Sequence, residues 1–85
     1  MIKVDNIKRT SWGCPAQWEG LSVSGGEIYI RYRHGYFMVE INNILLFEGE
    51  PELEDGGLMS FKEMKYETRD ILDFGDIKKE DTEND

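Results

Sequence analysis

The chain has 85 residues, and its 10 basic and 18 acidic side chains give a formal net charge of −8. A chain this short supports one domain with a thin core, because a small domain hides only about 60% of the surface that its unfolded form exposes. It contains no run of about 18 apolar residues, which argues against a membrane-spanning helix. Its single cysteine excludes an internal disulfide and a four-cysteine zinc site. These properties predict a soluble cytoplasmic protein with no membrane partner.

The clearest element is a hairpin in the first half of the chain. Two runs rich in β-forming residues, 27–33 and 36–41, flank the dipeptide His34-Gly35. A two-residue turn that ends in glycine favours a type I′ hairpin, because both central residues need positive φ and glycine adopts it freely. The two residues that flank this turn then lie opposite each other. In that register the apolar side chains share one face, which we assign to the core: Ile28, Ile30, Tyr32, Phe37, Val39 and Ile41.

A second tight turn follows at Asn42-Asn43, because asparagine tolerates left-handed backbone geometry. It leads into an apolar strand over residues 44–47, in which alternation places Leu45 and Phe47 on the face opposite the core. This run would form the edge of the sheet. An exposed edge strand can pair with a second copy of the chain across a two-fold axis, so a homo-oligomer is one expectation.

An earlier strand over residues 17–23 precedes the first hairpin and connects to it through Ser24 and two glycines. If Gly25-Gly26 is the two-residue loop, Trp18 lies opposite Arg33. Residues 1–9 can add a further edge strand. Sequential antiparallel strands usually pair, so the first half predicts an antiparallel β-meander of about four strands.

The second half predicts a loop, one helix and a tail. Pro51 and three glycines mark residues 48–57 as a loop. Ser60 and Glu63 have the spacing of a capping box, and helical spacing of apolar residues then continues to Leu72. Gly75 can end this helix. A strand over residues 64–68 is the alternative, because apolar residues also alternate there. The expected fold is therefore α+β, with one domain over residues 1–75 and a mobile acidic tail over 76–85.

The side chains that most enzymes use for nucleophilic or metal-assisted catalysis are absent or isolated in this sequence. Cys14 is the only cysteine and His34 the only histidine, and nothing in their spacing indicates the hydrogen-bonded pair that nucleophilic catalysis needs. No phosphate-binding loop, nucleophile elbow or zinc-binding helix motif is present. We therefore expect a protein that is not an enzyme, with no catalytic residue, no metal and no cofactor.

The face opposite the predicted core is the first candidate site. Arginine forks and aromatic rings together suit an anionic planar ligand, through bidentate contacts and stacking. A structural explanation is also open: Arg33 could stack on Trp18, Arg31 could pair with Glu40, or the helix could cover this face. The candidate ligand-binding residues are Trp18, Tyr29, Arg31, Arg33 and Tyr36.

Acidic side chains are the second candidate site. Residues 1–47 hold five basic and four acidic residues, whereas residues 48–85 hold five basic and fourteen acidic. A loop with this charge is either an ordinary solvated loop or a contact surface for a basic partner, and its spacing does not match a calcium-binding loop. The candidate partner-contact residues are Glu48, Glu50, Glu52, Glu54, Asp55, Glu67 and Asp70.

Two short motifs carry a family resemblance. Residues 14–20 read CPAQWEG and residues 29–35 read YIRYRHG. The chain resembles small bacterial or phage-type proteins of unassigned role that share a C-P-x-Q-W-E-G stretch and a Y-[IV]-R-Y-R-x-G strand and turn. The resemblance covers roughly residues 14–41 and implies that Trp18, Arg31 and Arg33 form one structural or functional unit. It implies no activity.

Two functions are consistent with these features. The first is a small acidic binding protein that docks on a protein partner, for which a phage-type inhibitor of a host defence or nucleic-acid-processing protein is an analogy in size and charge. The alternative is a protein that binds or sequesters a small anionic, nucleotide-like ligand through the arginine and aromatic face. Direct binding of duplex nucleic acid is not expected, because it needs several net basic groups on one surface.

Overall fold

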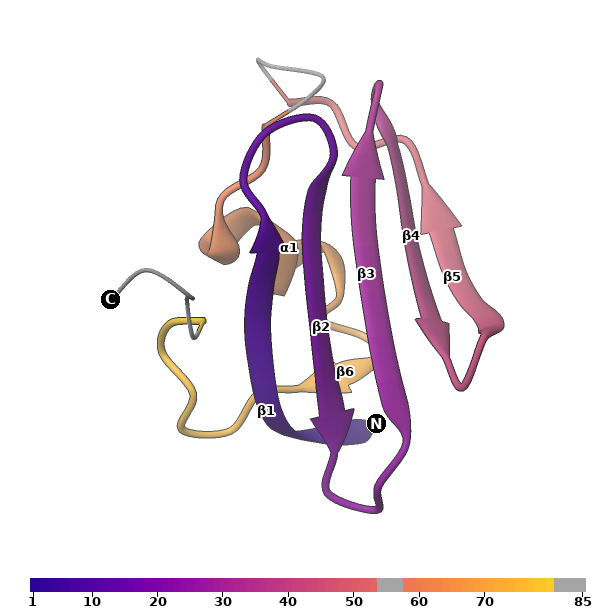
Figure 1. Cartoon of the computed structure of the whole chain (residues 1–85), viewed down its shortest axis with the longest axis vertical. Helices are drawn as coiled ribbons and strands as arrows, with labels where there is room; N and C mark the ends of the chain where they lie inside the picture. The colour runs from indigo at the N-terminus through magenta and orange to yellow at the C-terminus, as the bar shows by residue number, and fades with distance from the viewer. Residues whose placement is uncertain (54–57, 81–85) are drawn as a thin grey trace.

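The computed structural model describes residues 1–53 and 58–80. Within them, one short helix packs against a curled sheet of six strands in the order β5-β4-β3-β2-β1-β6 (Figure 1). The sheet is mixed, because β6 runs parallel to β1 and the other pairs are antiparallel. The elements are β1 (Ile2–Ser11), β2 (Ala16–Ser22), β3 (Glu27–Arg33), β4 (Tyr36–Ile41), β5 (Ile44–Gly49), α1 (Phe61–Glu67) and β6 (Leu72–Asp73).

The hairpin of β3 and β4 has the register expected from its turn. Arg33 pairs with Tyr36 and Ile28 pairs with Ile41. His34 and Gly35 have φ values of 50° and 80°, as a turn with two left-handed residues requires. The next turn, at Asn42-Asn43, also has positive φ at both residues and leads into β5. Local backbone preference is enough to determine these two turns.

The register of β2 against β3 differs from the prediction. Trp18 pairs with Ile30 instead of Arg33, a shift of three residues. The turn is longer than two residues: the Ser22 amide donates to the Gly26 carbonyl (2.8 Å), and the Gly26 amide donates to the Ser22 hydroxyl (2.8 Å). Because side chains alternate between faces, an odd shift moves every residue of β2 to the other face. The hydrogen bond that the Ser22 side chain accepts stabilises this longer turn, so the two glycines alone do not predict the length of the turn or the register.

The prediction of about four strands in an antiparallel meander is wrong in number and in direction. β1 is not at an edge: it lies between β2 and the two-residue strand β6, with Ile2 beside Leu72. β1 is a weak signal in sequence because exposed charged residues interrupt its buried positions, which are Val4, Ile7 and Arg9. β6 is too short to have a pattern of its own.

The helix begins where the sequence places it and ends earlier. The Ser60 hydroxyl accepts from the Glu63 amide (3.0 Å), and the Glu63 carboxylate accepts from the Ser60 amide (2.8 Å), which confirms the capping box. α1 then stops at Glu67, with Thr68 as its C-cap, so the predicted continuation through Leu72 to Gly75 is wrong. A β-branched threonine has low helix propensity, and Leu72 gains a place beside β1 instead.

The core lies between α1 and one face of the sheet, which we call the inner face. Its largest fully buried side chains include Trp18, Tyr32, Phe37 and Met64. Figure 1 shows α1 behind the strands, so the helix does not cover the opposite face. We call this opposite side the outer face, and its residues on β2 to β5 are Gln17, Glu19, Leu21, Glu27, Tyr29, Arg31, Arg33, Tyr36, Met38, Glu40, Leu45 and Glu48.

Part of the predicted tail makes tertiary contacts. Ile77 packs against the core, and Glu80 forms an ion pair with Arg9 (3.1 Å). Residues 81–85 lie outside the described residues. The division between domain and mobile tail at residue 76 stays a prediction, and these contacts join the described part of the segment to the sheet.

Candidate functional site

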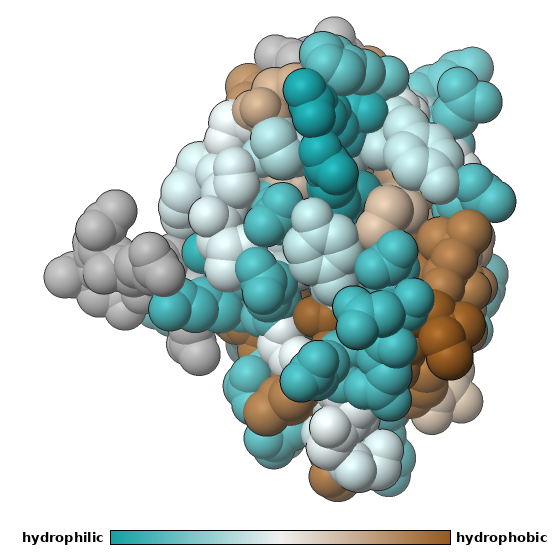
Figure 2. Space-filling model, turned by 45° about the vertical axis from the view of Figure 1, so that its right-hand side comes forward, coloured by the Kyte–Doolittle hydropathy of each residue, from teal (hydrophilic) through white to brown (hydrophobic). Residues whose placement is uncertain are grey.

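Strand β5 is an exposed edge of the sheet. It pairs with β4 on one side, and among the described residues no strand lies on its other side. Its first three side chains, Ile44, Leu45 and Leu46, are 72%, 47% and 44% exposed, and we call them the apolar triad. Figure 2 shows hydrophobic surface gathered on the right, the side on which β5 lies in Figure 1. At the opposite edge of the sheet, β6 pairs only with Ile2 and Lys3 of β1.

A β-bulge decides how the β5 side chains are divided between the two faces. Leu45 pairs with Glu40 and Phe47 pairs with Val39, so Leu46 is the additional residue. Phe47 therefore turns to the inner face, where its ring contacts Phe37 edge-on at 6.1 Å, while Leu45 stays on the outer face. The expectation that Leu45 and Phe47 share the outer face is wrong for this reason. Phe47 anchors the strand and leaves the apolar triad uncovered.

The surroundings of the apolar triad are acidic. Residues 35–61 contain six acidic side chains and no lysine, arginine or histidine. Glu40 lies opposite Leu45, and Glu48, Glu50 and Glu52 are exposed at the other end of β5. Glu48 also accepts a hydrogen bond from the Tyr36 hydroxyl (2.7 Å), which raises the pKa of that phenol above its usual value. Negative charge therefore lies on β4 opposite the middle of the triad and beyond the C-terminal end of the triad.

The other predicted partner-contact residues lie elsewhere in the chain. Glu67 is half-buried at the last position of α1, and Asp70 is exposed in the turn after it. Glu54 and Asp55 lie outside the described residues. The structure thus places Glu48, Glu50 and Glu52 beside β5 and assigns Glu67 and Asp70 to a separate element. A role for any of them in binding a partner stays a prediction.

Four of the five predicted ligand-binding residues share the outer face, and Trp18 does not. Tyr29 and Arg31 are half-buried, and Arg33 and Tyr36 are exposed. Trp18 is 0% exposed on the inner face, because of the shifted register of β2. On the outer face, Gln17 is the residue of β2 opposite Arg31, and its side-chain oxygen accepts from the Tyr29 hydroxyl (3.0 Å). The predicted aromatic platform therefore loses its largest ring.

The outer face combines charges of both signs. The Nε atom of Arg31 is buried and has no hydrogen-bond partner among the described residues. On the row nearer the β4–β5 turn, Glu19, Tyr29 and Glu40 are direct cross-strand neighbours. Together with Glu27 they line a hollow of about 450 Å³. The carboxylates in this part of the face would attract a cationic side chain. The unpartnered Nε of Arg31 would instead donate to a hydrogen-bond acceptor.

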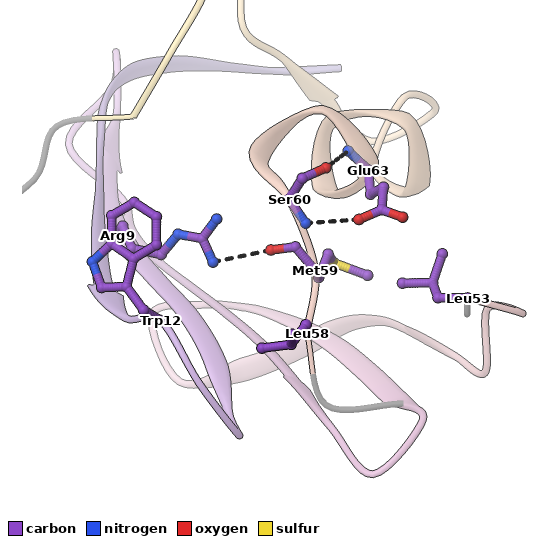
Figure 3. A pocket seen from close by; sticks show the side chains of 7 residues that line it. All are labelled: Arg9, Trp12, Leu53, Leu58, Met59, Ser60 and Glu63. Atoms are coloured by element: carbon purple, nitrogen blue, oxygen red, sulfur yellow. Dashed lines mark hydrogen bonds between the residues drawn. The ribbon is translucent and has the colours of Figure 1, made fainter. Parts of the chain in front are cut away.

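A cluster that the sequence did not reveal surrounds Arg9. Its guanidinium carbon lies 4.3 Å from the ring centroid of Trp12 and 4.3 Å from that of Trp18. One terminal nitrogen donates to the Met59 carbonyl (3.0 Å), as Figure 3 shows, and Nε donates to Glu80 (3.1 Å). Burial lowers the pKa of Arg9, and the attraction of Glu80 opposes that shift. The predicted stacking of Arg33 on Trp18 is therefore wrong: Arg9 occupies the ring.

The Arg9 cluster joins the end of β1 to the segment before α1. The hollow beside it has a volume of about 480 Å³ and is lined mainly by apolar side chains such as Leu53, Leu58 and Met59 (Figure 3). The bonding of Arg9 to Glu80 and Met59 gives the cluster a structural role. The sequence holds one indication of this cluster. Arg9 is two residues after Ile7, so strand alternation places it on the same, buried face of β1.

In residues 1–53 and 58–80, no three histidine, cysteine, aspartate or glutamate side chains are grouped closely enough to hold a metal ion. No helix in this part of the chain has the length and apolar character to cross a bilayer. Comparison of the chain with family models, with curated proteins and with solved structures found no match.

Proposed function

We propose that this chain is a small, non-enzymatic cytoplasmic protein that docks on a protein partner, and that β5 with its acidic surroundings is the docking surface. The observation that supports this most is the apolar triad on an unpaired edge strand. The free backbone groups of an edge and a contiguous apolar surface both gain free energy when a partner covers them.

The composition of β5 is unusual for an edge that only faces water. Edge strands are commonly protected by charged side chains, proline or extreme shortness. The first four residues of β5 carry no charge and no proline, and the strand is six residues long. The bulge at Leu46 gives some protection, because it interrupts regular pairing. The apolar triad is nevertheless exposed, which favours an edge that is used for contact.

The charge of the chain indicates the charge of the partner surface. A chain of net charge −8, with no basic residue between positions 35 and 61, attracts a basic surface and repels an acidic one. Occupation of the basic groove of a nucleic-acid-processing or host defence protein would fit this charge, and a phage-type inhibitor is the finer form of the proposal. The resemblance of residues 14–41 to small phage-type proteins is compatible with that form.

A small anionic ligand is the second candidate, favoured by one observation. The buried Nε of Arg31 has no partner among the described residues, and a phosphate oxygen would satisfy it. Arg33, two residues away, is exposed on the same face. The burial of Trp18 and the carboxylates around Tyr29 weaken this candidate. A rise in melting temperature with ATP that Arg31→Ala abolishes would favour it over docking.

The docking proposal is tested by co-purification from cells that make the chain naturally. Three tagged forms are compared: the unchanged chain, Leu45→Lys and Val23→Lys. Val23 is 65% exposed in the turn after β2, away from β5. Its lysine variant therefore replaces an exposed aliphatic side chain by a positive charge, as Leu45→Lys does, but outside the proposed surface. Both substitutions lie at exposed positions, where stability changes are usually within about 0.5 kcal/mol.

We expect one protein to be retained in stoichiometric amount by the unchanged chain and by Val23→Lys, and to be lost with Leu45→Lys. Increasing salt should release it, because the attraction is electrostatic. Equal retention by all three forms, or no retained protein with any of them, would contradict β5 as the docking surface.

A further inference from the structure

We infer that β5 binds its partner by strand addition, and that the occupant is an extended segment with an apolar centre and a lysine or arginine at the end that lies beside Glu48 and Glu50. This inference rests on the proposed docking function and names the mode of contact and the chemistry of the partner. It concerns the backbone of β5 as well as its side chains, and therefore goes beyond an apolar surface contact.

The backbone is available for a seventh strand. β5 pairs only with β4 among the described residues, so the outward N–H and C=O groups of Ile44–Gly49 have no strand partner there. The exposure of the apolar triad shows that no described segment covers this edge. An extended peptide beside such an edge gains main-chain hydrogen bonds, while side-chain contacts on alternate residues give selectivity. The length of β5 limits the added strand to about six residues.

The side chains of β5 require apolar residues at the centre of the occupant. Leu45 lies on the outer face, and Ile44 is opposite Ile41, which is half-buried beside the core. An added strand would therefore meet an aliphatic side chain on each face of the sheet. Valine, isoleucine or leucine at consecutive positions of the occupant would cover both.

The charges beyond the C-terminal end of the triad favour a basic residue at one end of the occupant. Glu48 is on β5 itself, and Glu50 directly follows the strand; both are exposed. β4 and β5 contain no basic side chain. Glu40 adds negative charge on β4, opposite Leu45, on the side of β5 away from the added strand. A lysine or arginine beside Glu48 and Glu50 therefore meets carboxylates that no basic residue of these two strands neutralises.

The same charges disfavour a second copy of the chain as the occupant. Two copies paired through β5 would bring together two surfaces without a basic residue, on molecules of charge −8 each. Like charges brought together across an interface cost several kcal/mol. The edge-strand dimer expected from sequence is therefore an alternative outcome of the test.

The test uses the full chain, labelled with nitrogen-15, and three acetylated and amidated peptides of eight residues. All three have the same centre of consecutive valine and isoleucine residues. They carry lysine, serine or glutamate at both ends, so that either strand direction places the terminal residue beside Glu48 and Glu50. We expect the lysine peptide to shift the amide resonances of Ile44–Gly49 and to slow their hydrogen exchange. Its affinity should exceed that of the glutamate peptide by more than tenfold and fall by more than tenfold between 50 and 500 mM sodium chloride.

Two controls separate strand addition from other contacts. A lysine peptide that is N-methylated at every central residue keeps its charge and side chains but has no central amide left to donate on either edge of the strand, so its binding should fall by more than tenfold. Leu45→Lys should weaken the unmethylated peptide to the same degree, whereas Val23→Lys should bind it as the unchanged chain does. Equal binding of methylated and unmethylated peptides, or shifts confined to residues outside β5, would overturn the inference.

Failure of the inference is distinguishable from failure of the docking function. If no peptide binds, but a cellular partner is retained and then lost with Leu45→Lys, strand addition is wrong and docking remains. If sedimentation shows that the unchanged chain is a dimer and that Leu45→Lys is a monomer, a second copy occupies β5 and the basic occupant is wrong.

Discussion

Gly20 occupies a place in β2 where a side chain does not fit. A β-carbon at this position would meet the carbonyl oxygen of Asn6 on β1, which is backbone and cannot rotate away. Gly20 pairs with Ile7, close to the irregularity in the β1–β2 register between Val4 and Asn6. Glycine here allows close approach of two strands.

We therefore expect Gly20→Ala to lower the free energy of unfolding by about 1–3 kcal/mol, the range for overpacking at a buried site. Gly13→Ala is the matched control, because a β-carbon at Gly13 meets nothing within 4 Å. Urea denaturation of both variants measures the difference. Equal stability of the two would contradict the close approach of β1 and β2.

Individual positions also show where sequence reasoning works. Positive φ at His34, Gly35, Asn42 and Asn43 follows from the identity of those residues, so the two turns and their registers could be predicted. The environment of Trp18 could not be predicted, because it depends on a hydrogen bond between Ser22 and Gly26 that changes the length of a turn.

At the scale of elements, the start of α1 is the feature most fully determined by its own residues. Ser60→Ala removes the acceptor for the Glu63 amide and should lower the free energy of unfolding by about 1 kcal/mol. Ser60→Thr keeps a hydroxyl and should lose less. Thermal and urea unfolding of the two variants provide the comparison. An alanine variant as stable as the unchanged chain would show that the capping box contributes nothing to the fold.

The ends of elements are determined by the surrounding structure more than by local pattern. The spacing of Phe61, Met64, Thr68 and Leu72 suits a helix, yet α1 stops before Thr68 and Leu72 pairs with Ile2. Likewise, alternation in β5 predicts one face for Leu45 and Phe47, and the bulge at Leu46 separates them. In both cases the packing gained, of Leu72 beside β1 and of Phe47 against Phe37, outweighs a local preference of a few tenths of a kcal/mol per residue.

For the whole molecule, the contact between Arg9 and Glu80 joins the first strand to the last described residue. The sequence alone predicts that removal of residues 79–85 leaves the melting temperature nearly unchanged. The structure predicts a loss, because Arg9 is only 5% exposed and Glu80 is its carboxylate partner. Glu80→Gln should lower the free energy of unfolding by about 1.5–3 kcal/mol, as for a hydrogen bond to a charged group.

Asp76→Asn is the control for that experiment, because Asp76 is exposed and close in sequence. Urea denaturation of both variants, and of the chain ending at Lys78, measures the contribution of the contact. If Glu80→Gln and the truncated chain are both as stable as the unchanged chain, the acidic tail contributes little to the fold and the expectation from sequence holds.

The sequence by itself determined the β3–β4 and β4–β5 turns, the capping box, the acidic surroundings of β5 and the position of β5 as an edge. Each of these depends on the identity of a few neighbouring residues or on overall charge. The tertiary structure alone decided the burial of Trp18, the place of Arg9 between two indole rings, the parallel strand β6 and the separation of Leu45 from Phe47. The place of Arg9 and the pairing of β6 depend on contacts between residues far apart in the chain. The burial of Trp18 and the separation of Leu45 from Phe47 depend on a hydrogen bond within a turn and on packing across a hairpin, where small local preferences yield to the free energy of packing.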